Sequence, residues 1–140
     1  MLVDPALIGT ESGPLEFDVE RGAIRRFADA IGDDNPLFRD SAYARAHGYA
    51  DVIAPPTFPT SFRLPFPVQI EASRTLHGEQ QFTYARPLVA GETVRCTSRL
   101  VDVYEKQGSL GAMTFVVTET TGADLDGRPI FTARSVGIVR

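Results

Sequence analysis

Four apolar side chains early in the chain recur at the i, i+3, i+4, i+7 spacing that places them on one face of an α-helix. They are Ile24, Phe27, Ala28 and Ile31. Asp18 precedes them as a candidate N-cap, and Gly32 follows them where a left-handed residue ends many helices. The pattern therefore predicts a helix over residues 19–31.

Two shorter helices are predicted after the first one. Asp40 or Ser41 is expected to cap a helix through residues 42–46. A third, apolar helix is expected over residues 58–64, with Pro59 in its first turn, where a missing N–H is harmless.

The second half of the chain changes to the period of two that is typical of half-buried strands. In residues 93–100, Arg95 and Arg99 are expected to face water, while Val94 and Cys96 face inward. Further strands are expected at residues 80–85, 113–118 and 130–139. Helices followed by antiparallel strands favour an α+β fold, taken here as a single domain over residues 1–140.

Composition excludes several classes of function. The net charge of −4 disfavours a nucleic-acid partner, because phosphate binding requires clustered Lys and Arg. Neither a signal peptide nor a membrane-spanning run is expected, and the single cysteine, Cys96, fits a reducing cytoplasm. Two widely spaced histidines, His47 and His77, do not suggest a zinc site, so we expect no metal and no cofactor.

The segment of residues 32–38 carries the strongest indication of chemistry. It reads Gly-Asp-Asp-Asn-Pro-Leu-Phe and lies between the first predicted helix and a Pro-rich turn at residues 54–57. Asp33 and Asn35 place a carboxylate and an amide beside a helix end, which suits a polar reacting group on an apolar substrate. Both residue types are also frequent in turns, so a structural role in the loop is the alternative.

These motifs resemble those of the MaoC-like hydratase/dehydratase family, whose motif has the form Gly-Asp-x-Asn-Pro-aliphatic-His. Residues 32–37 match this form, and residues 51–58, 76–84 and 86–91 fit the same pattern in the same order. The match covers nearly the whole chain. It is closest to the N-terminal dehydratase domain branch, which is similar to the acyl-binding subunits of heterodimeric 3-hydroxyacyl dehydratases.

The resemblance implies the hot-dog fold, in which a curved antiparallel β-sheet wraps around a central α-helix. It implies a thioester of coenzyme A or of an acyl carrier protein as substrate, with hydration of an enoyl group or dehydration of a 3-hydroxyacyl group as the reaction. It also implies a homodimer, or a heterodimer with another hot-dog subunit, and no membrane partner.

Carried over residue by residue, the resemblance places Asp33 on the catalytic aspartate and Asn35 on the asparagine of the motif. The Thr57–Phe58 peptide falls near the helix start that binds the thioester oxygen, where backbone N–H groups stabilise developing negative charge. Phe38 falls on the histidine of the motif. These positions predict Asp33 as a catalytic residue and the other four as substrate-binding residues.

Phe38 cannot transfer a proton, and the loss of a positioned acid or base typically costs on the order of 10²–10⁴-fold in rate. His77 is the candidate replacement, with a buried, hydrogen-bonded structural histidine as the alternative. Three functions stay open: a hydro-lyase, alone or with a catalytic partner; a non-catalytic acyl-thioester-binding subunit; and a thioesterase, which the hot-dog fold also hosts.

Overall fold

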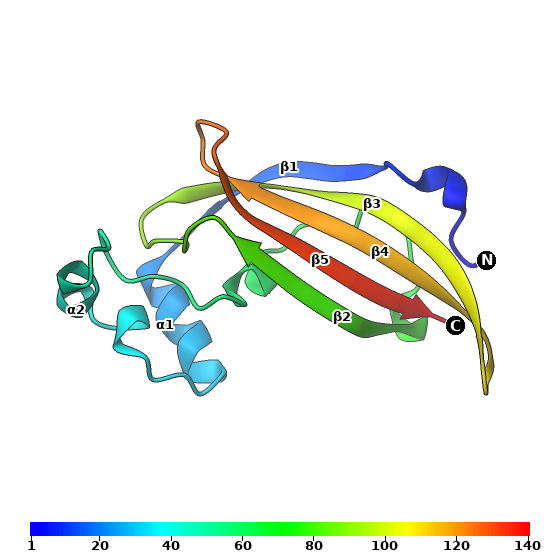
Figure 1. The fold of residues 1–140 in the computed structure, drawn as a ribbon, viewed down its shortest axis with the longest axis horizontal. Helices are drawn as coiled ribbons and strands as arrows, with labels where there is room; N and C mark the ends of the chain where they lie inside the picture. Colours follow the sequence, from blue (N-terminus) through cyan, green and yellow to red (C-terminus); the bar gives the residue numbers. More distant parts are fainter.

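The computed structural model describes residues 1–140, and its largest element is a five-stranded antiparallel sheet in the order β1-β3-β4-β5-β2 (Figure 1). The strands are β1 Glu11–Asp18, β2 Thr75–Tyr84, β3 Thr93–Gly108, β4 Gly111–Ala123 and β5 Pro129–Val139. The α-helices are α1 Arg21–Ala30 and α2 Ser41–Ala46. Short 3₁₀ helices occupy Pro5–Leu7, Pro36–Phe38, Phe58–Ser61 and Ala72–Arg74. The predicted α+β class is confirmed.

The two α-helices lie at one end of the long, curved sheet (Figure 1). Helix α1 packs there because Ile24 and Ala28 lie on one helical face, four residues apart, and both are fully buried. They share one apolar cluster with Val94 and Cys96 of β3 and Phe131 of β5. The predicted helix over residues 19–31 is therefore confirmed, with ends that differ by one or two residues.

Two details of the predicted helices are wrong. Asp18 does not cap α1, because β1 continues through Asp18, which pairs with Thr93 and accepts a hydrogen bond from its hydroxyl at 2.8 Å. The helix expected over residues 58–64 stops at Ser61. The hydroxyl of Ser61 donates to the Phe58 carbonyl at 2.7 Å, and Pro65 disfavours helical geometry in the residue before it.

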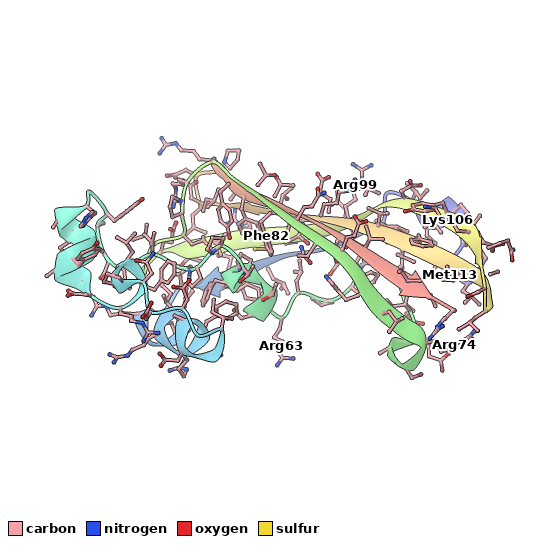
Figure 2. All side chains as sticks on the ribbon, turned by 60° about the horizontal axis from the view of Figure 1, so that its bottom comes forward. Arg63, Arg74, Phe82, Arg99, Lys106 and Met113 are labelled. Atoms are coloured by element: carbon pink, nitrogen blue, oxygen red, sulfur yellow. The ribbon has the colours of Figure 1, made fainter.

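The chain that follows this 3₁₀ helix runs in extended form across one face of the sheet, and we call residues 62–70 the linker. At its start, Phe62 and Leu64 are partly buried, whereas Arg63 is exposed and points away from the body of the protein (Figure 2). This alternation turns two apolar side chains of the linker toward the sheet. The linker thus forms a wall opposite the inner face of the strands.

The strands are longer than the sequence pattern predicts, and β1 has no counterpart among the predicted strands. The 16-residue strand β3 contains the predicted inward row, with Val94 and Cys96 buried and Arg95 and Arg99 exposed. On β4, Gly122 lies against the ring of Phe131, and a Cβ atom at residue 122 would lie 2.1 Å from that ring. None of the helices combines the length and the apolar character needed to cross a bilayer.

Candidate functional site

A cavity of about 390 Å³ lies beside the segment that resembles the hydratase motif, and we call it the loop cavity. Three stretches of chain form its wall: the motif segment, the Pro-rich turn and the end of β2 with the residues after it. The lining residues are Asn35, Leu37, Phe38, Ile53, Ala54, Pro56, Tyr84, Ala85, Arg86 and Pro87. The structure thus brings Asn35 and Phe38, two predicted substrate-binding residues, to one cavity.

The side chains of Asp33 and Asn35 brace the loop. The Asp33 Oδ1 atom accepts a hydrogen bond from the Asn35 N–H at 3.1 Å, and the Asn35 Oδ1 atom accepts one from the Leu37 N–H at 3.0 Å. The Asp33 carbonyl accepts a further hydrogen bond from the Arg39 guanidinium at 2.6 Å. Both side chains therefore have the structural role that is common for Asp and Asn in turns, and Asp33 does not line the loop cavity.

Phe38 presents a ring to the loop cavity and is otherwise part of the core. Its side chain is only 5% exposed and belongs to the same apolar cluster as α1 and the inner face of the sheet. The cavity wall therefore has no proton-transfer group at the position where the family motif carries a histidine.

The opposite wall of the loop cavity is held by hydrogen bonds. The Tyr84 hydroxyl donates to the Pro56 carbonyl at 2.6 Å, and burial raises the pKa of this phenol, so it stays protonated at neutral pH. Arg86 forms a bidentate pair with Glu92, at 2.8 and 2.7 Å. Because this pair engages both terminal nitrogens of Arg86, the guanidinium serves mainly to fix the wall.

Thr57 and Phe58 lie outside the loop cavity. Thr57 is exposed, whereas Phe58 is buried and packs edge-on against Phe27 of α1, with ring centroids 5.6 Å apart. The helix that starts at Phe58 has only four residues. The N–H groups of Phe58 and Thr60 already donate to the carbonyls of Pro55 and Thr57, and Pro59 has no N–H, so few backbone donors remain for a thioester oxygen.

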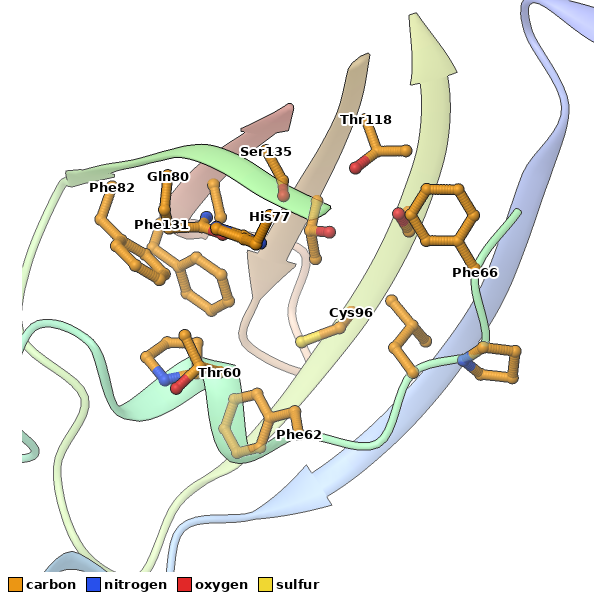
Figure 3. Close-up of a pocket in the computed structure, with 16 residues that line it drawn as sticks. Thr60, Phe62, Phe66, His77, Gln80, Phe82, Cys96, Thr118, Phe131 and Ser135 are labelled. Carbon is orange, nitrogen blue, oxygen red and sulfur yellow. The ribbon is translucent and has the colours of Figure 1, made fainter. Parts of the chain in front are cut away.

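A second cavity, of about 340 Å³, lies between the linker and the inner face of the sheet, and we call it the sheet cavity (Figure 3). Phe62, Leu64 and Phe66 line it from the linker. The strands contribute His77, Gln80, Phe82, Cys96, Ser98, Thr118, Thr120, Phe131, Ala133 and Ser135. One wall is therefore apolar, whereas the other mixes apolar and polar side chains.

His77 lines the sheet cavity (Figure 3), whereas Asp33 belongs to the segment beside the loop cavity. The structure therefore does not bring the two predicted catalytic residues together in one cavity. The alternative of a buried structural histidine is wrong, because His77 is exposed on the edge strand β2. His47 is also exposed, at the C-terminus of α2, where its Nδ1 atom lies 2.8 Å from the Tyr43 carbonyl.

The two cavities adjoin along β2. Phe82 lines the sheet cavity and Tyr84 lines the loop cavity, and their rings stack with centroids 6.3 Å apart. Phe131 packs against Tyr84 at 5.7 Å and completes this aromatic divider. Cys96 reaches the sheet cavity from β3, and burial raises the pKa of its thiol to about 12. A thiol with so high a pKa is a poor nucleophile at neutral pH.

Sequence reasoning missed the polar side chains of the sheet cavity. One signal for them exists in β3, where Ser98 interrupts the inward row of Val94, Cys96 and Leu100. The contribution of the other strands depends on their register and is not visible in any single segment.

The curved antiparallel sheet packed against α1, with cavities on its inner face, defines a hot-dog protein. The chain belongs to the family described as FAS1-like, dehydratase domain region, whose family model matches residues 6–133. The predicted resemblance to MaoC-like hydratases and dehydratases is thereby confirmed, together with the fold.

Three similar proteins illustrate the relationship. A "UPF0336 protein" of Thermobifida fusca is 39% identical over 135 residues, which cover 91% of this chain and 86% of that protein. A chain of the C-terminally truncated HadBC (3R-hydroxyacyl-ACP dehydratase) complex of Mycobacterium tuberculosis aligns with a TM-score of 0.82, 26% identity and 99% coverage of both chains. A structure described as a MaoC-like dehydratase aligns with a TM-score of 0.81 and 23% identity, over 96% of this chain and 42% of that one.

Proposed function

We propose that this chain is the acyl-binding subunit of a heteromeric acyl-thioester hydratase or dehydratase, in which a second hot-dog subunit performs the proton transfers. The observation that carries this proposal is the position of Phe38. A buried ring occupies the place of the motif histidine and lines the loop cavity. Proton transfer in such a reaction needs an acid or base within hydrogen-bond reach of the substrate, and Phe38 provides neither.

The remaining candidate groups support the same division of labour. Asp33 uses one carboxylate oxygen to hold the loop, and His77 lines the other cavity. An acid–base pair made of these two residues would need both to face one substrate atom. Asp33 belongs to the segment beside the loop cavity, whereas His77 lines the sheet cavity, and the rings of Phe82 and Tyr84 lie between the two cavities. A heteromeric assembly also agrees with the HadBC complex, a chain of which shares this fold along its whole length.

The two cavities suggest how an acyl thioester is held. The loop cavity, next to the motif segment, receives the thioester end, and the sheet cavity receives the acyl chain along β2. The coenzyme A or carrier-protein thioesters implied by the sequence resemblance present such a polar head on an apolar tail. In this assignment Asn35 and Phe38 contact the head of the substrate, while Thr57 and Phe58 support the turn between the cavities.

A self-sufficient hydro-lyase is the second candidate. It is favoured by the partly exposed carboxylate of Asp33, whose Oδ2 atom makes no hydrogen bond within the protein. In that case Asp33 would act as the base, and the chain would turn over substrate as a homodimer.

The test compares the chain alone with the chain co-expressed with a MaoC-like partner that carries the intact Asp-x-Asn-Pro-aliphatic-His motif. Hydration of crotonyl-CoA is followed by the absorbance of the conjugated thioester. We expect no turnover by the chain alone and clear turnover by the complex. Asp33→Asn in this chain should leave the kcat of the complex within about 2-fold, because the partner transfers the protons.

The control is Asp34→Asn, which changes a neighbouring exposed carboxylate. Turnover by the chain alone that falls on the order of 10²–10⁴-fold in Asp33→Asn, and not in the control, would overturn the proposal in favour of the hydro-lyase. Release of free thiol from crotonyl-CoA would instead identify a thioesterase.

A further inference from the structure

A row of polar side chains, which we call the polar band, crosses the floor of the sheet cavity (Figure 3). The register pairs Gln80 with Ser135, Ser135 with Thr118, and Thr120 with Ser98. Thr118 and Thr120 are two residues apart and so share one face of β4. The band is therefore continuous across β2, β5, β4 and β3.

The polar band separates two apolar clusters on the inner face of the sheet. Along β3, Ser98 lies between Cys96, in the cluster that contains α1, and Leu100, in the second cluster. Along β5, Ser135 lies between Ala133 of the first cluster and Val139 of the second. An inner face built only for packing would be apolar at these positions, as it is on either side.

Two buried residues of the band carry hydroxyl groups that have no partner in the protein and open into the cavity. Ser98 and Thr118 are only 6% and 4% exposed, and neither hydroxyl makes a hydrogen bond within the protein. Because polar groups in a protein interior are nearly always hydrogen-bonded, the partners of these two hydroxyls are water or an occupant of the cavity. An alkyl chain over them would remove their water and return no hydrogen bond, which is unfavourable.

The wall of the sheet cavity opposite the polar band is apolar. Phe62, Leu64 and Phe66 of the linker face the band across the cavity. An occupant that satisfies both walls is a mainly apolar chain with an oxygen on one side. A short polar ligand would leave the aromatic wall without contacts, and a plain alkyl chain would leave the hydroxyls without partners.

We propose that the sheet cavity binds an acyl chain that bears a hydroxyl or keto oxygen away from its thioester. This inference rests on the proposed function, since it takes an acyl thioester as the occupant. The oxygen belongs to the distal part of the chain because the thioester end lies in the loop cavity. The aromatic divider of Phe82, Tyr84 and Phe131 separates that cavity from the polar band.

The test is calorimetric titration of the full chain with three pantetheine thioesters, whose arm is common to coenzyme A and acyl carrier proteins. The acyl groups are dodecanoyl, 3-hydroxydodecanoyl and a mid-chain-hydroxylated dodecanoyl. Each hydrogen bond gained is typically worth about 3- to 10-fold in affinity. We therefore expect the mid-chain-hydroxylated compound to bind about 10-fold more tightly than the other two.

The variant Ser98→Ala/Thr118→Val should remove this advantage and leave the affinity for the dodecanoyl thioester unchanged or higher. Its melting temperature should not fall, because the two hydroxyls have no partner in the protein to lose. Thr121→Val, on the outer face of β4, is the matched control and should change neither affinity.

The outcomes separate the two proposals. Equal affinity for all three compounds, an advantage confined to the 3-hydroxyl compound, or an advantage that survives in the double variant would overturn the inference and leave acyl binding intact. If none of the three compounds binds, the proposed acyl-binding function fails, and the inference fails with it.

Discussion

Phe38 packs in the core at the position where the family motif carries a proton-transferring histidine. Its ring joins the main apolar cluster, and its N–H donates to the Asn35 carbonyl at 3.0 Å, which closes the turn around Pro36. A histidine here would place a polar ring among apolar side chains, and a buried imidazole needs hydrogen-bond partners. The loop is therefore built as a rigid wall of the loop cavity.

Replacing Phe38 with alanine should lower the free energy of unfolding by about 3–5 kcal/mol, because it removes a buried ring and leaves a cavity. Urea denaturation measures this change. Leu125→Ala is the control, because Leu125 is 53% exposed in the β4–β5 turn and its loss should cost less than about 0.5 kcal/mol. Equal costs for the two variants would show that Phe38 does not anchor the loop.

At the scale of residues, the sequence predicts the loop that carries Asp33 and Asn35, but not which residues lie around it. The turn-forming character of Asp33 and Asn35 is local, so their role in bracing the loop was predictable. That His77 lies in a different cavity from the motif segment depends on the strand order, in which β2 is an edge strand beside β5. No local sequence pattern shows that His77 and the motif segment lie at different cavities.

Helix α2 depends on its cap more than a longer helix would. It has six residues, and short helices gain little stability from their own hydrogen bonds. The Oδ1 atom of Asp40 accepts hydrogen bonds from the N–H groups of Ala42 and Tyr43, at 3.0 and 3.1 Å. These bonds satisfy two of the donors that a helix start leaves free.

Asp40→Ala should therefore lower the free energy of unfolding by about 1 kcal/mol, the usual cost of losing an N-cap. Thermal denaturation gives the comparison. Asp34→Ala is the matched control, since it removes an exposed carboxylate that makes no hydrogen bond in the protein. The capping role is wrong if both variants melt at the temperature of the parent protein.

Helices and strands could be predicted where the residues that determine them are close together in the sequence. The spacing of Ile24 and Ala28 predicts α1. Asp40 or Ser41 predicts the start of α2, and the structure has Asp40 as the cap. Strand β1 was missed because Gly13 and Pro14 interrupt it and its hydrogen bonds go to β3, some 80 residues along the chain. Strand pairing of this kind is set by tertiary contacts and not by propensity.

At the scale of the whole molecule, Asp51 connects segments that are distant in sequence. Its carboxylate accepts hydrogen bonds from Arg21 at the start of α1, Ser41 at the start of α2, and the N–H of Val52. The bond from Arg21 is the main reason why the pKa of Asp51 lies well below its ordinary value of 3.8. This contact fixes both helices at one end of the sheet.

The sign of the resulting pH dependence follows from the lowered pKa. The folded state binds the Asp51 proton more weakly than the unfolded state, so the stabilisation is present above pH 3.8 and is lost as the pH falls below it. Asp51→Asn should melt at a lower temperature than the parent protein at neutral pH, and this difference should shrink in acid. Thermal melts across the acidic range measure it.

Asp126→Asn is the control, because the carboxylate of Asp126 lies in an exposed turn and accepts no hydrogen bond in the protein. A gap between the parent protein and Asp51→Asn that stays constant down to the most acidic melts would contradict the proposed linkage.

The contact between Gly122 and Phe131 has a consequence for the range of ligands. The ring of Phe131 rests where a side chain on residue 122 would otherwise stand, 2.1 Å from the missing Cβ atom. Any larger residue would displace the ring from β4 into the space beneath the linker, because Phe131 borders that space. If the proposed function holds, a single additional carbon would shorten the longest fatty tail that fits, and relatives with alanine at this position should favour briefer chains.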